Sequence, residues 1–301
     1  MTESSFDIET VPPVELHATR PFYWSVRREI WENRSLYIAP LVVAAFVLLV
    51  CLPAAFALPR RLRTIDPAKH TALMTKPYSF APAPIMLVSF LVGLFYSIDA
   101  LYGERRDRSI LFWKSLPVSD VTTVLAKASI PIIVLPLIAL VLSVAAICML
   151  LLQGTTVLTL TGTNPMTLWS RLRFFERPLF MLYGLVVHAL WFTPIYAWLL
   201  LISAWAKRSP LLWAVLPPVL ICVLEKTTFN TTYFGAFIRY RITGAMDNAF
   251  VVLKPGPVSH ISSWDILPLR FLSTPGLWGG LIFAALCLAA TVRLRRNREP
   301  I

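Results

Sequence analysis

The charged segment 99–120, DALYGERRDRSILFWKSLPVSD, holds the residue types best able to contact a partner. Glu104 and Arg105 stand where the chain leaves an apolar run, and the apolar residues 110–113 follow them. Pro117 interrupts a helix, and Ser119 can cap the next one. We therefore expect a short amphipathic helix that offers both apolar and ionic contacts. A basic loop that only orients the flanking apolar segments is the alternative on these grounds.

Three isolated polar residues near or inside apolar runs could also do chemistry. Asp99 and Lys127 stand near the ends of two such runs and could form an ion pair or extend separately to the interface. His188 is the only side chain inside a long apolar run that titrates near neutral pH. A polar contact between helices and a substrate or proton role are its two interpretations. Gly276 and Gly280 have helix-packing spacing at the edge of the last apolar run.

Catalytic and metal-binding patterns do not occur in the sequence. The four histidines, at 17, 70, 188 and 260, are scattered, and neither H-E-x-x-H nor G-x-S-x-G is found. The four cysteines lie in apolar runs without CxxC spacing, which favours buried hydrophobic side chains over metal ligands or disulfides. We expect no catalytic, cofactor-binding or metal site in this chain.

The composition indicates a membrane protein. Of 301 residues, 57% are hydrophobic and only 15% are charged, whereas soluble domains average about 25% charged residues. Residues 1–20 are polar and lack the basic and apolar regions of a signal peptide, so the first span is expected to be an uncleaved anchor. The net charge of +12 falls mostly between apolar runs, which indicates contact with anionic lipid headgroups rather than nucleic acid.

Runs without charged residues place the membrane spans. About 20 apolar residues cross the hydrocarbon core. The uncharged runs predict one all-α transmembrane domain over 1–301, with six spans near 36–58, 80–101, 122–151, 178–205, 209–225 and 274–294. The fifth is short and contains Pro217 and Pro218. Residues 21–35, with Tyr23, Val26 and Ile30 at helical spacing, predict an interfacial helix after the polar tail 1–20.

Two connections between the predicted spans are long. The Thr-rich stretch 154–170 is expected to be an outside loop. Residues 226–273 mix aromatic, glycine, proline and charged residues, and are expected to form an extracytoplasmic cap or to re-enter the membrane. Lys and Arg counts number 14 on the N-terminal side and 13 on the other, so totals barely set the orientation. Their closer packing against helix ends favours an inside N-terminus.

The order of residues in the charged segment resembles the hallmark loop of ABC-2-type transporter permeases. Glu104-Arg105, Ser109-Ile-Leu-Phe112, Ser115-Leu-Pro-Val-Ser119 and the later Lys127 follow that pattern, with Arg108-Ser109 in place of the usual Gly-Thr. The close match covers about 30 residues. The layout of an interfacial helix, six spans, a large fifth-to-sixth connection and a basic C-terminus is similar over the whole chain.

The resemblance implies a transport subunit rather than an enzyme. In such permeases the loop is a coupling helix that rests on a separate ATP-binding subunit, and two permeases join two ATPases in an exporter. ATP and magnesium would bind that partner, because this chain has no G-x-x-x-x-G-K-[ST] motif. The coupling-loop residues, as contact or shaping residues, would be Glu104, Arg105, Ser109, Phe112, Trp113 and Pro117.

The resemblance also implies a location and leaves two other functions to weigh. It places a multi-pass protein in a plasma membrane, as in a prokaryotic inner membrane, with both termini in the cytoplasm. An ion-coupled secondary transporter would be expected to show inverted repeats and charges at the midplane of the membrane. An intramembrane enzyme would need a nucleophile with a base, or a metal cluster.

Overall fold

The computed structural model describes residues 19–115, 118–162, 164–171, 176–250 and 268–297. These described residues are 90% helical, and no strand occurs among them. The elements in order are α1 (Thr19–Glu32), α2 (Ser35–Thr64), α3 (Pro67–Phe80), α4 (Pro82–Asp99), α5 (Tyr102–Arg106), α6 (Ile110–Ser115), α7 (Asp120–Ser129), the π-helix η1 (Ile130–Val134), α8 (Leu135–Leu160), α9 (Met166–Arg171), α10 (Glu176–Trp205), α11 (Pro210–Phe229), α12 (Tyr233–Ala249), α13 (Pro268–Ser273) and α14 (Pro275–Asn297).

The six expected spans are confirmed, so the chain is an all-α polytopic membrane protein. Six helical segments are long and apolar enough to cross a bilayer: Ser35–Leu62, Leu73–Arg106, Asp120–Leu160, Pro178–Trp205, Pro210–Phe229 and Pro275–Asn297. The second and third, of 34 and 41 residues, are longer than the spans predicted near 80–101 and 122–151. The second gains α3 and α5 at its ends, and the third joins α7, η1 and α8 into one rod.

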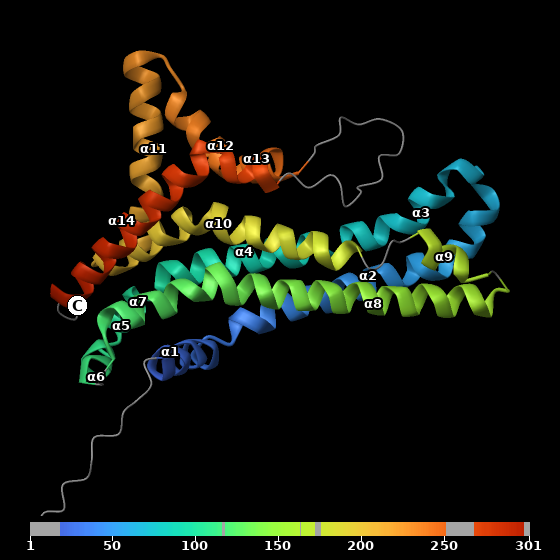
Figure 1. Cartoon of the computed structure of the whole chain (residues 1–301), viewed down its shortest axis with the longest axis horizontal. Coiled ribbons are helices and arrows are strands. Elements are labelled where there is room, and N and C mark those ends of the chain that lie inside the picture. The colour runs from blue at the N-terminus through green and yellow to red at the C-terminus, as the bar shows by residue number, and fades with distance from the viewer. Residues whose placement is uncertain (1–18, 116–117, 163, 172–175, 251–267, 298–301) are drawn as a thin grey trace, which may run out of the picture.

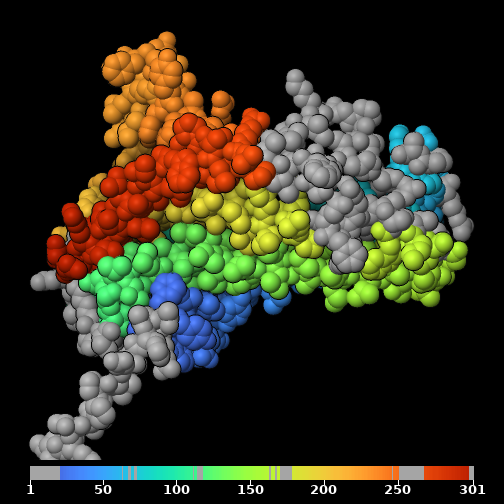
Figure 2. All heavy atoms as spheres, in the orientation of Figure 1, coloured from blue at the N-terminus to red at the C-terminus, as the bar shows by residue number. Residues whose placement is uncertain are grey.

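The long helices α2, α4, α8 and α10 run alongside one another, and α14 crosses α10 (Figure 1). The helix α1, the short helices α5 and α6, and the C-terminal end of α14 gather at one end of this bundle, while α3 and α9 lie at the other (Figure 1). The helix α11 stands away from the bundle, and its only buried residues are Pro210 and Ala214 at its start (Figure 2). The site described below therefore lies at the end that holds α1, α5 and α6.

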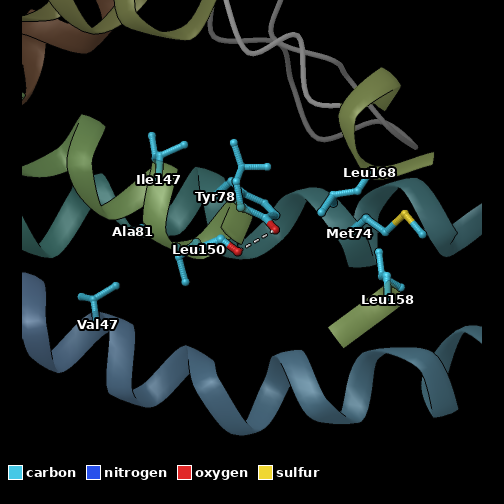
Figure 3. Packing of buried hydrophobic residues seen from close by; sticks show 9 residues of the cluster. Val47, Met74, Tyr78, Ala81, Ile147, Leu150, Leu158 and Leu168 are labelled. Carbon is cyan, nitrogen blue, oxygen red and sulfur yellow. Dashed lines mark hydrogen bonds between the residues drawn. The ribbon is translucent and has the colours of Figure 1, made fainter. Parts of the chain in front are cut away.

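A separate apolar core holds the opposite end together (Figure 3). Met74 and Tyr78 of α3 pack there against Leu150 and Leu158 of α8 and Leu168 of α9. The Tyr78 hydroxyl donates a hydrogen bond to the Leu150 carbonyl oxygen at 3.3 Å, so its polar atom has an acceptor within the core.

The prediction of an outside loop over 154–170 was wrong for much of its length. The helix α8 continues to Leu160, and α9 occupies Met166–Arg171. The threonines stay in the helix because their hydroxyls bond back to the preceding turn. Thr155 Oγ1 donates to the Leu151 carbonyl at 2.7 Å, and Thr156 Oγ1 to that of Leu152 at 2.8 Å.

Gly154 gives a direct test of this core. A Cβ at Gly154 would lie 2.8 Å from the Tyr78 hydroxyl and 3.0 Å from Leu168 Cδ2, so the neighbours would have to move. Overpacking of this kind costs about 1–3 kcal/mol, and we expect Gly154→Ala to lower the thermal unfolding midpoint in detergent. Gly184→Ala is the control, because its nearest neighbour lies at an ordinary 3.8 Å. Equal midpoints for the two variants would contradict the packing.

Candidate functional site

A buried glutamate of α1 begins the site. The Glu29 side chain is 1% exposed, although it belongs to a helix that lies outside the six spans. Its Oε1 accepts hydrogen bonds from Lys127 Nζ at 2.8 Å and from Arg28 Nη2 at 2.6 Å. Its Oε2 accepts from the Tyr96 hydroxyl at 2.7 Å. The carboxylate therefore joins α1 to α4 and α7.

Glu104 of α5 extends the same network. Its Oε1 lies 3.1 Å from Lys127 Nζ and 3.4 Å from Arg28 Nη2. Its Oε2 accepts a hydrogen bond from Arg295 Nη1 of α14 at 2.6 Å. Arg295 in turn donates from Nε to Asp120 Oδ1, in the first turn of α7, at 3.1 Å.

These residues form one neutral assembly, which we call the charge cluster. Its three carboxylates face three cations, and the Lys127 and Arg295 side chains are each only 3% exposed. Removing a charge from water costs several kcal/mol, and only a complete set of partners offsets that cost. The cluster therefore requires α1, α5, α7 and α14 to meet; its members are Arg28, Glu29, Glu104, Asp120, Lys127 and Arg295.

The electrostatics of α1 agree with this geometry. Burial raises the pKa of the Glu29 carboxyl, but Lys127, Tyr96 and Arg28 outweigh burial and hold that pKa below its usual value. Burial lowers the pKa of the Arg28 guanidinium, whereas its hydrogen bond to Glu29 and the surrounding carboxylates raise it, and they prevail. Both groups stay charged across the physiological range.

Arg105 fixes α5 onto the end of α10. The residue is 4% exposed, and its Nη2 donates to the carbonyl oxygens of Ser203, at 2.9 Å, and Ala206. A cation at the last carbonyls of a helix also complements the helix dipole. In the other direction, Ser203 Oγ accepts from the backbone N–H groups of Leu101 and Tyr102 at 3.0 and 2.9 Å, at the start of α5. The short helix α5 is thus held to α10 from both ends.

A tight turn then directs α6 outward. Arg108 has φ of 57°, a left-handed conformation that ends α5. In α6, Ile110 is 2% exposed, whereas Phe112 is 60% exposed. The Arg28 guanidinium lies 3.9 Å from the centre of the Trp113 ring, so the charge cluster also holds the base of α6. Ile110 is therefore the inward anchor of α6, and Phe112 is its outward aromatic ring.

The residues that the sequence predicted for the coupling loop lie in different surroundings in the structure. Glu104, Arg105 and Trp113 lie in or beside the charge cluster. The Ser109 hydroxyl, just before α6, donates to the Glu104 carbonyl oxygen at 3.4 Å. Ser119 caps α7, accepting from the Thr122 N–H at 3.1 Å, as expected. Pro117 lies outside the described residues.

The intramembrane residues have partners other than those expected. Lys127 pairs with Glu29 and Glu104 rather than with Asp99, and it does not extend to the surface. Asp99 is exposed at the end of α4, with its carboxylate beside Gly103. His188 Nε2 and the Tyr196 hydroxyl are 3.1 Å apart, so its polar contact is within α10 and not between helices.

Sequence reasoning did not find four members of the charge cluster, which are Arg28, Glu29, Asp120 and Arg295. The helical spacing of Tyr23, Val26 and Ile30 suggested an apolar face for α1, but Tyr23 is 58% exposed. The buried pair on α1 is Ser25 and Glu29, one turn apart. The available signal was the carboxylate of Glu29 directly before Ile30. The sequence alone does not show that Glu29 is buried, because its basic partner Lys127 lies on another helix.

Comparisons with known proteins add no relative. The chain matches no protein-family model, no curated protein and no solved structure. Its own residues therefore carry the functional argument.

Removing one charge should show how strongly the cluster is coupled. Lys127→Met leaves Glu29 buried without its closest cation from another helix, and we expect a loss of about 3–5 kcal/mol in unfolding free energy. The double variant Glu29→Gln/Lys127→Met should recover part of that loss, because no lone charge remains. Thermal or denaturant unfolding in detergent measures both.

The control is the exposed pair Arg106–Asp107, whose N–O distance is 2.9 Å. We expect Arg106→Gln to change stability by less than about 1 kcal/mol. Strictly additive losses for Glu29→Gln and Lys127→Met would contradict the coupling.

Proposed function

We propose that this chain is the membrane-embedded permease subunit of an ATP-binding-cassette exporter of the ABC-2 type. The observation that carries the proposal is that α6 exposes Phe112 while its attachment to the protein is fixed. Glu104 of α5 is bound to α7 and α14, and the Trp113 ring of α6 contacts Arg28 of α1. A docking element needs an accessible contact and a rigid attachment to the parts that move, and α6 has both.

In this proposal, the residues of the coupling loop have different roles according to their burial. Glu104 and Arg105 are buried and hold the loop in place, so they shape it rather than contact a partner. Phe112 faces outward and is the contact residue. A movement of α6 would be transmitted to α7 through the ion pair of Glu104 and Lys127. The helix α7 continues without a break through η1 and α8.

The proposed assembly has two copies of this chain and two ATP-binding subunits, which bind ATP and magnesium. The loop, α1 and the end of α14 would face the cytoplasm of a plasma membrane, where the ATPases lie. The apolar helix α11, which touches the bundle mainly at its start, is free to contact a second copy or lipid.

Phe112 provides the test. The test requires an ATP-binding-cassette protein, recognised by its Walker A motif, in an adjacent reading frame, and this protein is co-expressed with the full chain. We expect Phe112→Asp to reduce co-purification of that ATPase at least about tenfold, as truncation of a central aromatic contact does. The chain itself should keep its unfolding midpoint, because this side chain is exposed.

Leu160→Asp is the matched control, since Leu160 is 78% exposed at the far end of α8. It should leave the complex intact. Normal assembly and nucleotide-driven transport by Phe112→Asp would contradict the docking role. Transport that persists without nucleotide under an ion gradient would instead favour a secondary transporter.

A further inference from the structure

Another buried cation lies outside the charge cluster, and no carboxylate of the described residues pairs with it. Arg241 of α12 is 7% exposed. The helix α12 packs against α10, where Trp191 Nε1 donates to the Arg241 carbonyl oxygen at 2.7 Å. The Trp191 ring also lies 4.7 Å from the Arg241 guanidinium carbon. The charge is therefore inside the protein and pressed against an aromatic ring.

The guanidinium has more donors than acceptors around it. Nη1 donates to the Gly276 carbonyl oxygen of α14 at 3.0 Å. Nε and Nη2 are buried and have no hydrogen-bond partner in the part of the chain that the structure describes. Buried arginine N–H groups are costly without acceptors, and a carboxylate or phosphate is the group whose geometry matches two of them together. The Trp191 ring offsets part of the cost of burying the guanidinium charge, but it does not accept hydrogen bonds from Nε or Nη2.

Arg241 lies level with the middle of the fourth membrane span. Its contact Trp191 is 13 residues from Pro178 and 14 from Trp205, the ends of the fourth span. At 1.5 Å per residue it is about 21 Å from the end that Lys207 and Arg208 follow. A hydrocarbon core is about 30 Å thick, so water-borne anions do not reach this level freely. An unpaired ionised residue at such a depth is a candidate functional site.

The surroundings suit an amphiphile. Exposed apolar side chains occur on α12, α13 and α14 and include Phe237, Leu272 and Trp278, which are 57%, 46% and 55% exposed. The described parts of α12 and α13 hold three arginines, at 239, 241 and 270, against the single carboxylate of Asp247. Glu225 is not available, because its oxygens accept from Thr231, Tyr233 and Phe234.

We propose that Arg241 binds the phosphate group of an anionic amphiphile, whose acyl chains lie on the apolar surface of α12–α14. The phosphate oxygens supply the acceptors that Nε and Nη2 lack, and the acyl chains bring the phosphate to this depth. The proposal goes beyond the ATPase-coupling role and does not depend on it, because binding needs no nucleotide and no partner subunit.

The probe is dioctanoyl phosphatidic acid, titrated into the purified full chain in a non-ionic detergent. Dioctanoylglycerol has the same chains without phosphate, and inorganic phosphate is the anion without chains. We expect phosphatidic acid to bind at least about tenfold more tightly than either, because both the anion and the chains contribute. Isothermal titration calorimetry or thermophoresis gives the dissociation constants.

Two matched pairs of variants locate the site. Arg241→Gln should weaken phosphatidic acid binding at least about tenfold, whereas Arg239→Gln, on the exposed side of the same helix, should change it less than about twofold. A Cβ at Gly280 would overlap the Arg241 guanidinium, while a Cβ at Gly279 meets nothing within 4 Å. Gly280→Ala should therefore weaken binding with the arginine still present, and Gly279→Ala should not.

Several results would overturn the proposal. Equal effects of Arg241→Gln and Arg239→Gln would indicate general surface charge. Inorganic phosphate binding as tightly as phosphatidic acid would indicate a free-anion site, and equal binding of dioctanoylglycerol would indicate an apolar one. A change in oligomeric state for Arg241→Gln, with unchanged binding of phosphatidic acid, would instead assign Arg241 to contact with a second copy. A failure of the ATPase test above leaves these outcomes unaffected.

Discussion

The structure depends on the charge cluster, in which three cations and three carboxylates form one largely buried ion-pair network. Glu29 and Lys127 are almost fully buried, so each would be costly alone. Because their partners belong to α1, α5, α7 and α14, these costs disappear only when the four helices meet in one arrangement. Such a network contributes less to net stability than to the choice of a single arrangement. It brings together segments that are almost 270 residues apart in the sequence.

The same interaction explains why the segment α5–α6 can be short and yet well placed. The helices α5 and α6 have five and six residues, too few to be stable alone. Glu104 and Arg105 fix α5 to its neighbours, and Arg28 stacks on Trp113 beneath α6. Lys127 also lies one turn before η1, and a π-helix of this kind often marks a functional site within a longer helix. The charge cluster therefore connects the α5–α6 segment to the helix that leads into this π-helix of the third span.

The fold could be predicted from the sequence further than the site could. Uncharged runs found all six spans because the bilayer imposes their length and composition. The third span was predicted too short because its Thr-rich end was taken for a loop, whereas the threonine hydroxyls of α8 bond within their own helix. In the site, the order of residues pointed to Glu104, Arg105 and Lys127. It could not reveal Glu29 or Arg295, because the partners of a buried charge lie on other helices. Asp99 was the carboxylate expected to pair with Lys127, but Glu29 and Glu104 are its partners in space.

The central claim is that the charge cluster holds α1 and α6 as one rigid unit. Double electron–electron resonance between spin labels at Tyr23 and Phe112, both exposed, measures this directly in a cysteine-free chain. The account predicts a narrow distance distribution that broadens in Lys127→Met and stays narrow in Arg106→Gln. A distribution that is already broad in the unaltered background, or that Lys127→Met leaves unchanged, would contradict it.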